Sequence, residues 1–385
     1  MLKPLIKWPG GKSNELDRFI SLIPDYDRYI EPFVGGGAMF FYLNPEKALI
    51  NDTSEDLMEF YRLVKDQDPE FHRILDLYCD SFARLQEQCE VRYPDLLALY
   101  QVYKKAREEK LDIRHLRLNE GLIRQIGEDP QIMTELVLDP PEFLEQLIRM
   151  TEDKILRTIQ NDRKKPLADQ DLKQNLVTGF TSGFYMYFRG VFNEIAQGKL
   201  VAATPYRIAN FYFIREYCYG SMFRYNHKGE FNIPYGGISY NKKDFRAKVS
   251  CMFGKDVASL MGRTEIYCED FEAFLSRLTL TERDFLFLDP PYDTDFSEYE
   301  GKDFDKNDQK RLADFLKGTR AQFLLVLKNT EFIYGLYEDC GFRILTFDNH
   351  YLYNMRSRND RSAQHLIITN IPEEEIPWKR ENFLI

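Results

Sequence analysis

Asp289, Pro290, Pro291 and Tyr292 combine residue types that could carry out chemistry on an aromatic amine. They follow directly on the apolar run 285–288. Two consecutive prolines cannot continue a strand ladder, and each restricts the residue before it to an extended conformation. The pattern therefore predicts a stiff strand exit that holds the Asp289 carboxylate and the Pro290 carbonyl in a defined relation, with an aromatic ring close by.

Such an arrangement suits methylation of an exocyclic amine such as N6 of adenine. The lone pair of that nitrogen is delocalised into the ring, so the amine is a poor nucleophile until two acceptors take its N–H bonds and draw it toward tetrahedral geometry. An aromatic ring stacked on the base would hold the base outside the double helix. The alternative interpretation is a proline-rich turn after a buried strand, with no chemistry of its own.

A second candidate site lies near the N-terminus, where glycines 35–37 follow a strand-like segment, 28–34. Segment 48–51 is predicted to be a second strand, and it ends at Asp52. A glycine turn between strand and helix lets a ligand approach bare backbone, and an acid at the tip of the next strand can accept both hydroxyls of a ribose. The spacing lacks the GxGxxG pattern of a nicotinamide site.

Four blocks of sequence, in one order along the chain, resemble a known family. They are residues 7–12, residues 31–37, the recognition region 217–226 with 229–236, and residues 289–292. In these blocks the chain is similar to the Dam-type (alpha-class, D12 group) DNA adenine-N6 methyltransferases, whose motifs run KWxGGK, EPFxGxG, recognition region, DPPY. The resemblance covers roughly residues 1–66 and 204–370.

The resemblance implies S-adenosylmethionine as the methyl donor. At the positions that match the family's motifs, the methionine end of this donor would be held by Trp8 and Lys12. Its backbone-lined path would be formed by Phe33 and Gly35, and its ribose would be held by Asp52. Its adenine would contact Asp270 and Phe271, and Asp289 would serve the edge shared by the donor and the target base. No metal is implied, because a sulfonium is already an activated methyl donor and the amine needs positioning more than acid–base help.

The resemblance also implies a double-stranded DNA substrate. At matching positions, the base stack would be probed by Tyr219 and Met222, a guanine would be read by Arg224, an outer guanine would be contacted by Lys7, and the DNA would be touched by Pro234. Arginine pairs in bidentate fashion with O6 and N7 of guanine. GATC-specific relatives have an asparagine where this chain has Gly220, so the predicted target is GATC or another motif that contains a guanine.

Basic residues form local clusters although the formal net charge is −10. One cluster comprises Lys242, Lys243, Arg246 and Lys248, and another includes Arg356 and Arg358, which are predicted phosphate contacts. Protein surfaces that bind DNA phosphates need positive charge only locally. The acidic total therefore does not exclude DNA binding.

The spacing of apolar residues divides the chain. Alternating strand and helix patterns predict a doubly wound α/β methyltransferase domain from residues 1–66 and 245–372. Apolar residues at spacings of three and four predict a helical insertion at 67–204, followed by a DNA-recognition segment with a hairpin loop at 205–244 and a tail at 373–385. The insertion is either a scaffold around the recognition region or a separate partner-binding module.

An aromatic stretch inside this insertion, 182–189, either packs in a core or forms a surface that stacks on bases; core packing is the preferred interpretation. The chain contains no apolar run long enough to span a bilayer and no signal-peptide pattern at its start. Its six cysteines include no CxxC pair and its five histidines are scattered, which disfavours zinc and indicates reduced thiols. We expect a cytoplasmic protein of bacterial or phage origin that acts on DNA, as a monomer and away from membranes.

Other functions stay open at this point. One is a related exocyclic-amine methyltransferase that acts on cytosine N4, RNA adenine or a glutamine side chain; Asp289 before Pro-Pro-Tyr and the motif order argue against it. Another is a DNA-binding relative that has lost its activity, although the catalytic-loop residues and the cofactor acids are all present. A nicotinamide or nucleotide enzyme would require a phosphate-loop glycine pattern that this chain lacks.

Overall fold

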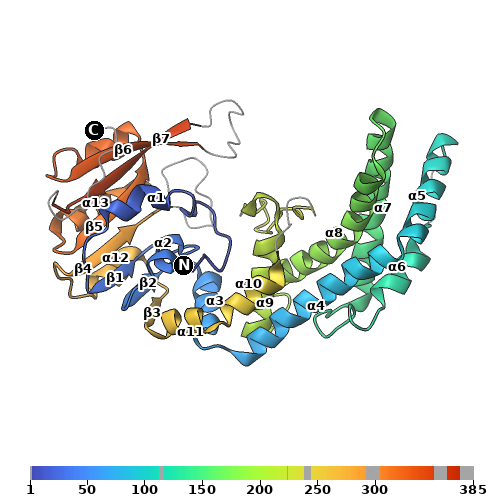
Figure 1. The fold of residues 1–385 in the computed structure, drawn as a ribbon, viewed down its shortest axis with the longest axis horizontal. Helices are drawn as coiled ribbons and strands as arrows, with labels where there is room; N and C mark the ends of the chain where they lie inside the picture. Colours follow the sequence, from blue (N-terminus) through green and yellow to red (C-terminus); the bar gives the residue numbers. More distant parts are fainter. Residues whose placement is uncertain are drawn as a thin grey trace. The chain divides into compact units, whose positions relative to one another are not determined.

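The computed structural model describes residues 2–111, 117–222, 224–237, 244–291, 304–350 and 362–372, without the side chains of residues 221, 348–350, 362 and 363. The chain divides into two compact units (Figure 1). One consists of Met1–Asp66 and Gly254–Ile385, and the other of Gln67–Phe253. The two ends of the sequence therefore build one unit, and its middle builds the other.

A single sheet organises the first unit. In the described part of the chain its strands run in the order β3-β2-β1-β4-β5-β7-β6. The strands are β1 (Arg28–Glu31), β2 (Ala48–Asn51), β3 (Thr264–Tyr267), β4 (Asp284–Leu288), β5 (Gln322–Lys328), β6 (Arg343–His350) and β7 (Ser362–Thr369). All neighbours from β3 to β5 pair in parallel, and β7 pairs antiparallel with both β5 and β6. The order reverses between β1 and β4, which confirms the predicted doubly wound α/β fold.

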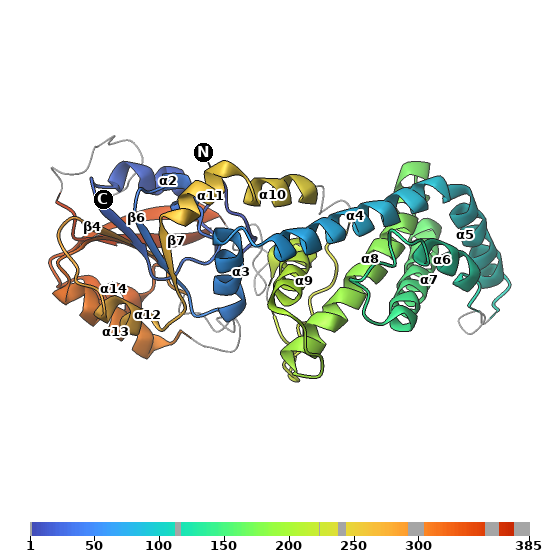
Figure 2. The ribbon, with the colours of Figure 1, turned by 90° about the horizontal axis from the view of Figure 1, so that it is seen from below.

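Helices cover both faces of this sheet. They are α1 (Leu16–Phe19), continued by η1 (Ile20–Leu22), α2 (Ala38–Leu43), α3 (Glu55–Lys65), α11 (Lys255–Gly262), α12 (Phe271–Ser276), α13 (Lys306–Gly318) and α14 (Glu331–Tyr337). Figure 2 shows α12, α13 and α14 together on one side of the strands and α2 on the other. Each face of the sheet therefore has its own layer of helices.

Strand β4 illustrates why both faces of the sheet are apolar. Its residues Leu286 and Leu288 join the core beneath α12, α13 and α14. Phe285 and Phe287 point to the opposite face, where Phe287 meets Phe19 with ring centroids 6.0 Å apart. Successive side chains of a strand alternate between faces, so a strand buried on both sides reads as a continuous apolar run. Segment 285–288 is such a run, and it places the following Asp289 at the carboxyl edge of the sheet.

The second unit is mostly helical, as the sequence predicted for the insertion. Its helices are α4 (Pro69–Val91), α5 (Tyr93–Glu108), α6 (Glu120–Gly127), α7 (Pro140–Lys164), α8 (Asp169–Ala196), α9 (Thr204–Tyr217), η3 (Tyr219–Ser221) and α10 (Phe245–Met252). Two of the long helices, α4 and α7, begin with proline in the first turn and a capping aspartate before it. Asp68 accepts from the Phe71 N–H at 2.7 Å, and Asp139 accepts from the Glu142 N–H at 3.0 Å.

Helix α8 lies at the centre of this unit. It packs closely on α7 because it carries Gly183 at the contact, where an added Cβ would lie 2.7 Å from the Leu147 Cα. Its aromatic stretch 182–189 is largely core: Phe184, Tyr185 and Phe188 have no exposed surface. The preferred interpretation of this stretch as core packing is confirmed for these rings.

Two parts of the chain differ from the sequence interpretation. Residues 245–253 were assigned to the catalytic domain, yet α10 groups with the helical unit because the Phe245 ring packs on Tyr212 and Tyr217, with centroids 5.5 and 5.4 Å apart. Strand β6 was not predicted, although its apolar residues Leu345 and Phe347 alternate and are buried. None of the helices in the described part of the chain has the length and apolarity needed to cross a bilayer.

Candidate functional site

Asp289 leaves the central strand β4 and forms an ion pair with Lys12 from the N-terminal segment. The Lys12 Nζ lies 2.8 Å from the Asp289 Oδ1, and the two side chains are 4% and 17% exposed. The same ammonium group donates to the Gly10 carbonyl at 3.0 Å. Burial raises the pKa of the Asp289 carboxyl, and the Lys12 charge opposes that rise. Lys12 therefore favours the ionised form of a carboxylate that is mostly removed from water.

The prolines after Asp289 are supported from α13. The Gln309 Nε2 donates to the Pro291 carbonyl at 3.1 Å, and Gln309 is fully buried. Helix α13 begins at a capping box formed by Asp305 and Asp308, so its start is visible in the sequence. The hydrogen bond from Gln309 to the loop after β4 is not visible in the sequence, and sequence reasoning missed it. Tyr292, the last residue of the motif, lies outside the described residues.

The glycine turn after β1 is held by hydrogen bonds at both ends of Gly35. The Gly35 N–H donates to the Asp52 Oδ2 at 3.0 Å, and the Tyr61 hydroxyl donates to the Gly35 carbonyl at 2.8 Å. Gly35 has φ +47°, and a Cβ there would lie 2.7 Å from the Trp8 Cδ1. The indole of Trp8 therefore lies directly against bare backbone, which only glycine permits.

Asp52 has a structural task that sequence reasoning did not foresee. Besides accepting from Gly35, its Oδ1 accepts from the Ser54 N–H at 3.0 Å. Burial raises the pKa of Asp52, and its backbone hydrogen bonds oppose that rise. Each carboxylate oxygen has a second lone pair, so these contacts leave acceptor capacity for a ribose hydroxyl.

Glu31 is a third acid in this region, and the sequence analysis gave it no role. It is 2% exposed and accepts from the Tyr29 hydroxyl at 2.8 Å. Burial raises its pKa well above the usual range, the Tyr29 hydrogen bond opposes this, and the charges of Asp289 and Asp52 raise it further. The signal in the sequence was an acidic residue at the end of a predicted strand. Its burial in the structure makes it a candidate functional residue, because unpaired acids are rarely buried.

Asn51 ties together the carboxyl ends of three strands. Its Nδ2 donates to the carbonyls of Pro32 and Glu269, each at 3.0 Å, and its Oδ1 accepts from the Glu269 N–H at 3.0 Å. Pro32 follows β1, Asn51 is the last residue of β2, and Glu269 follows β3. Asn51 is fully buried, so the side chain fixes the relative positions of the loops that carry the site.

An aromatic cluster lies beside these strand ends. The ring centroids of Phe33, Phe271 and Phe304 are 5.4 to 5.7 Å apart. The Arg311 guanidinium lies 4.9 Å from the Phe271 centroid and pairs with Asp270 at 2.6 Å. Asp270 is exposed and also caps α12. The predicted cofactor residues Phe33, Asp270 and Phe271 thus lie close together.

The predicted DNA-reading residues of the second unit lie in a hairpin, residues 224–236, and in the turn that precedes it, which contains Tyr219 and Met222. Arg224 is exposed, and its Nε donates to the Asn232 Oδ1 at 3.3 Å, across the hairpin. The Pro234 carbonyl accepts from the Tyr219 N–H at 2.9 Å. Tyr219 is 40% exposed and Met222 is half-buried. These four residues therefore belong to one local structure.

The remaining predicted DNA contacts do not belong to this hairpin. Lys7 is half-buried in the first unit, and Arg356 and Arg358 lie outside the described residues. Within the basic cluster near residue 245, Arg246 pairs with Asp76 and Asp80, and Lys248 pairs with Glu216. These two cations therefore have internal partners, which the sequence could not show because the acids come from α4 and α9.

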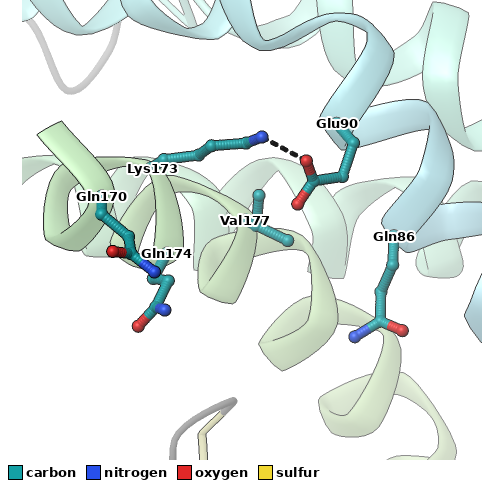
Figure 3. Close-up of a pocket in the computed structure, with 6 residues that line it drawn as sticks. All are labelled: Gln86, Glu90, Gln170, Lys173, Gln174 and Val177. Atoms are coloured by element: carbon teal, nitrogen blue, oxygen red, sulfur yellow. Dashed lines mark ion pairs between the residues drawn. The ribbon is translucent and has the colours of Figure 1, made fainter.

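A cavity in the helical unit contrasts with the strand-end site. It has a volume of about 420 Å³ and lies between α4 and α8 (Figure 3). It is lined by Gln86, Glu90, Gln170, Lys173, Gln174 and Val177. Its charged residues, Lys173 and Glu90, form an ion pair, and both are partly exposed. In the part of the chain that the structure describes, no group of three or more His, Cys, Asp or Glu residues could hold a metal ion. The cavity offers no comparable set of reactive groups.

Comparisons with known proteins agree with this geometry. The model of the D12 class N6 adenine-specific DNA methyltransferases matches residues 8–125 and 135–355. A type II methyltransferase, M.MjaIII, from Methanocaldococcus jannaschii is 27% identical over 89% of this chain and 90% of its own length. A type II methyltransferase, M.CviBI, from Paramecium bursaria Chlorella virus NC1A is 23% identical over 96% of this chain and 100% of its own.

A DNA N-6-adenine-methyltransferase from Escherichia phage P1 is 25% identical over 89% of this chain, which spans 32% of that longer protein. The family model matches most of the chain, both the strand-end site and the greater part of the helical unit. The chain thus belongs to the D12 class N6 adenine-specific DNA methyltransferase family, and it is an adenine-specific DNA methyltransferase.

Proposed function

We propose that this enzyme transfers a methyl group from S-adenosylmethionine to N6 of an adenine within a short double-stranded DNA motif that contains a guanine. The observation that carries the proposal is the Asp289–Lys12 ion pair at the exit of β4, beside the proline loop that Gln309 supports. Ligands of open α/β sheets bind at the carboxyl ends of the strands, near the point where strand order reverses. The β1–β4 boundary is that point here.

The residues present at the strand ends fit the proposed methyl donor. The Trp8 indole packs on Gly35 at the glycine turn, Asp52 offers an acceptor for ribose, and the rings of Phe33 and Phe271 offer an apolar wall for adenine. Lys12 and Trp8 would hold the methionine end, and Asp270 the adenine amine. When bound, the donor supplies a methyl group already activated by its sulfonium.

The protein's task in the reaction is to position the amine. The Asp289 carboxylate and the Pro290 carbonyl would each accept one N6–H bond, which localises the nitrogen lone pair and aims it at the methyl carbon. As the N–C bond forms and the C–S bond breaks, one N6 proton must leave, and the Asp289 carboxylate would accept it. Tyr292 and Pro291 would keep the flipped base in line, with Tyr292 stacked on its ring.

Target reading is proposed for the hairpin of the second unit. Arg224 would pair with a guanine, Tyr219 and Met222 would contact the base stack, and Pro234 would shape the loop against the DNA. Gly220 cannot make the side-chain contact that an asparagine would make, so the motif need not be GATC. Lys7 would contact an outer guanine, and Arg356 with Arg358 would bind phosphates.

Two further aspects belong to the proposal. Two relatives carry type II methyltransferase in their names, which supports a role in restriction–modification. Action as a monomer is also part of the proposal. Alternative substrates, cytosine N4 and RNA adenine, are addressed by the same experiment as the main proposal.

The test is the Asp289→Ala variant, assayed by incorporation of tritiated methyl groups into DNA, with nucleoside analysis to identify the methylated base. Loss of one preorganised acceptor should lower kcat by roughly 10²–10³-fold, or more if the proton also needs this carboxylate. Asp314→Asn is the matched control, because Asp314 is a 75% exposed acid on α13 and should leave the rate unchanged. Wild-type activity in Asp289→Ala, or methylation of cytosine instead of adenine, would refute the assignment.

A further inference from the structure

Helix α8 of the insertion holds the recognition hairpin through the side chain of Asn193. The Asn193 Nδ2 donates to the Phe231 carbonyl at 3.1 Å, and the Phe231 N–H donates to the Asn193 Oδ1 at 2.8 Å. A side-chain amide presents a donor and an acceptor in the same relation as a peptide group. Asn193 therefore pairs with Phe231 much as a residue of a neighbouring strand would.

A second anchor acts two residues further along the hairpin. The Ile233 carbonyl accepts from the Tyr185 hydroxyl at 3.0 Å and from the Arg189 Nη1 at 3.2 Å. Tyr185 is fully buried and Arg189 is half-buried. Burial lowers the pKa of Arg189, so its charge is partly desolvated where it meets this carbonyl. The carbonyl belongs to the peptide that precedes Pro234.

The anchoring residues share one face of α8. Tyr185, Arg189 and Asn193 are spaced four residues apart, and residues at this spacing lie one above another on a helix. Just beyond the end of α8, the Gln197 Nε2 donates to the Glu230 Oε1 at 3.3 Å, which extends the same row. The hairpin therefore follows the helix along a continuous line of polar contacts.

The opposite edge of the same segment holds the proposed reading arginine. The Asn232 N–H donates to the Arg224 carbonyl at 3.2 Å, and the Arg224 Nε donates to the Asn232 Oδ1 at 3.3 Å. In an extended chain, successive peptide groups point to opposite sides. The backbone groups of Phe231 and Ile233 thus face α8, and the N–H of Asn232 faces Arg224.

We propose that the face of α8 formed by Tyr185, Arg189 and Asn193 sets the register of the recognition hairpin and thereby the base that Arg224 can reach. These three are positioning residues and touch no base themselves. The insertion is then part of the sequence-reading apparatus and not a separate partner-binding module. The inference rests on the proposed function, in which Arg224 reads a guanine.

The test compares Asn193→Ala with Asn175→Ala. Asn175 lies on the same helix and donates to the Asp171 carbonyl one turn away, so it is a matched control for loss of an amide on α8. The first readout is hydrogen exchange of the Phe231 amide, which needs no DNA. Loss of its acceptor should speed exchange by about tenfold in Asn193→Ala, and Asn175→Ala should behave as wild type.

The second readout is the methylation profile across a random-sequence DNA library. Asn193→Ala should lose about tenfold of its preference for the base read by Arg224, with unchanged affinity for the methyl donor. Asn193→Asp, which keeps the acceptor for the Phe231 N–H, should lie between the two and serves if Asn193→Ala does not fold. Exchange at Phe231 equal to that of the control, or an unchanged motif in Asn193→Ala, overturns the inference.

Failure of the proposed function gives a different pattern. If Arg224→Ala also leaves the motif unchanged, then Arg224 does not read the base, and hydrogen exchange alone decides whether α8 holds the hairpin. If Arg224→Ala relaxes the motif and Asn193→Ala does not, the reading residue stands and the positioning role of α8 is rejected. A uniform loss of activity on all sequences with a lowered Tm would mark Asn193 as a structural residue only.

Discussion

Replacing Lys12 by methionine removes the positive charge beside Asp289 while keeping most of the side-chain volume. At 2.8 Å and an effective dielectric constant of about 20, the Coulomb attraction is roughly 6 kcal/mol. Desolvation of the ammonium group, which is on a side chain only 4% exposed, offsets a large part of this. Removing one partner of a buried ion pair typically lowers the free energy of unfolding by about 3–5 kcal/mol. Because Asp289 is 17% exposed, we expect a loss of about 3 kcal/mol.

The direction of the pH effect follows from the two influences on Asp289. Burial raises its pKa, and Lys12 opposes the rise, so removal of Lys12 leaves burial unopposed. In the proposed mechanism the ionised carboxylate accepts an N6–H bond, so activity should be lost as pH falls through the pKa of Asp289. In Lys12→Met this loss should begin at higher pH. The activity of the variant should therefore fall below that of the wild type toward acidic pH and recover in part in alkaline solution.

The stability of Lys12→Met should depend on pH in the direction opposite to its activity. Because burial raises the pKa of Asp289 in the folded state, the unpaired carboxylate destabilises the fold above that pKa, and protonation relieves the penalty below it. The stability deficit of Lys12→Met should therefore be largest at alkaline pH and shrink on acidification. Chemical denaturation across the pH range measures this.

The assay is the pH profile of kcat/KM for methyl transfer, with calorimetric titration of the methyl donor at each pH to separate a change in cofactor affinity. Lys317→Met is the control, since that lysine forms an exposed ion pair with Asp314 on α13 and should show the wild-type profile. A Lys12→Met profile that is lower than wild type by the same factor at every pH would refute the claim that Lys12 governs the ionisation of Asp289.

Three further variants test the cofactor and DNA sites. Asp52→Ala should weaken binding of S-adenosylmethionine by about 1.5–3 kcal/mol in calorimetry, and unchanged affinity would mean that the ribose is held elsewhere. Gly35→Ala should destabilise the protein by at least about 2 kcal/mol in thermal denaturation, because its backbone is left-handed and the new Cβ would meet Trp8 at 2.7 Å; Gly318→Ala, with open space around it, is the control. Arg224→Ala should cost about 1–3 kcal/mol on the preferred site and relax one position of the motif, whereas Arg358→Ala should weaken all sequences alike and flatten the salt dependence; identical library profiles for the two variants would contradict this distinction.

Features that depend on local conformation were predictable from the sequence. The stop at Asp289 follows from the stiffness of two prolines after an apolar run, and the strand–glycine–helix order at 28–38 follows from local patterning. The apolar segments of β4 and β5 are continuous because both faces of those strands are covered. The motif order along the chain was sufficient to indicate the family.

Strand β6 and the grouping of α10 with the helical unit were harder to predict from the sequence. The alternation in β6 is short, and its pairing with β7 depends on a segment later in the chain. The assignment of α10 depends on where the Phe245 ring packs, and several aromatic neighbours come from α9. Neither is a property of the local sequence.

The chemical state of the site was decided by tertiary structure. Lys12 meets Asp289 only because the pairing of β1 with β4 brings the two ends of the chain together. Gln309 meets Pro291, and the Asp52 carboxylate meets the Gly35 N–H, because elements near one another in the sequence fold back to the same edge of the sheet. The sequence alone determined which groups were available and where the chain must turn. Burial, which shifts the pKa values of Glu31 and Asp289, arises only when distant segments exclude water from the same volume.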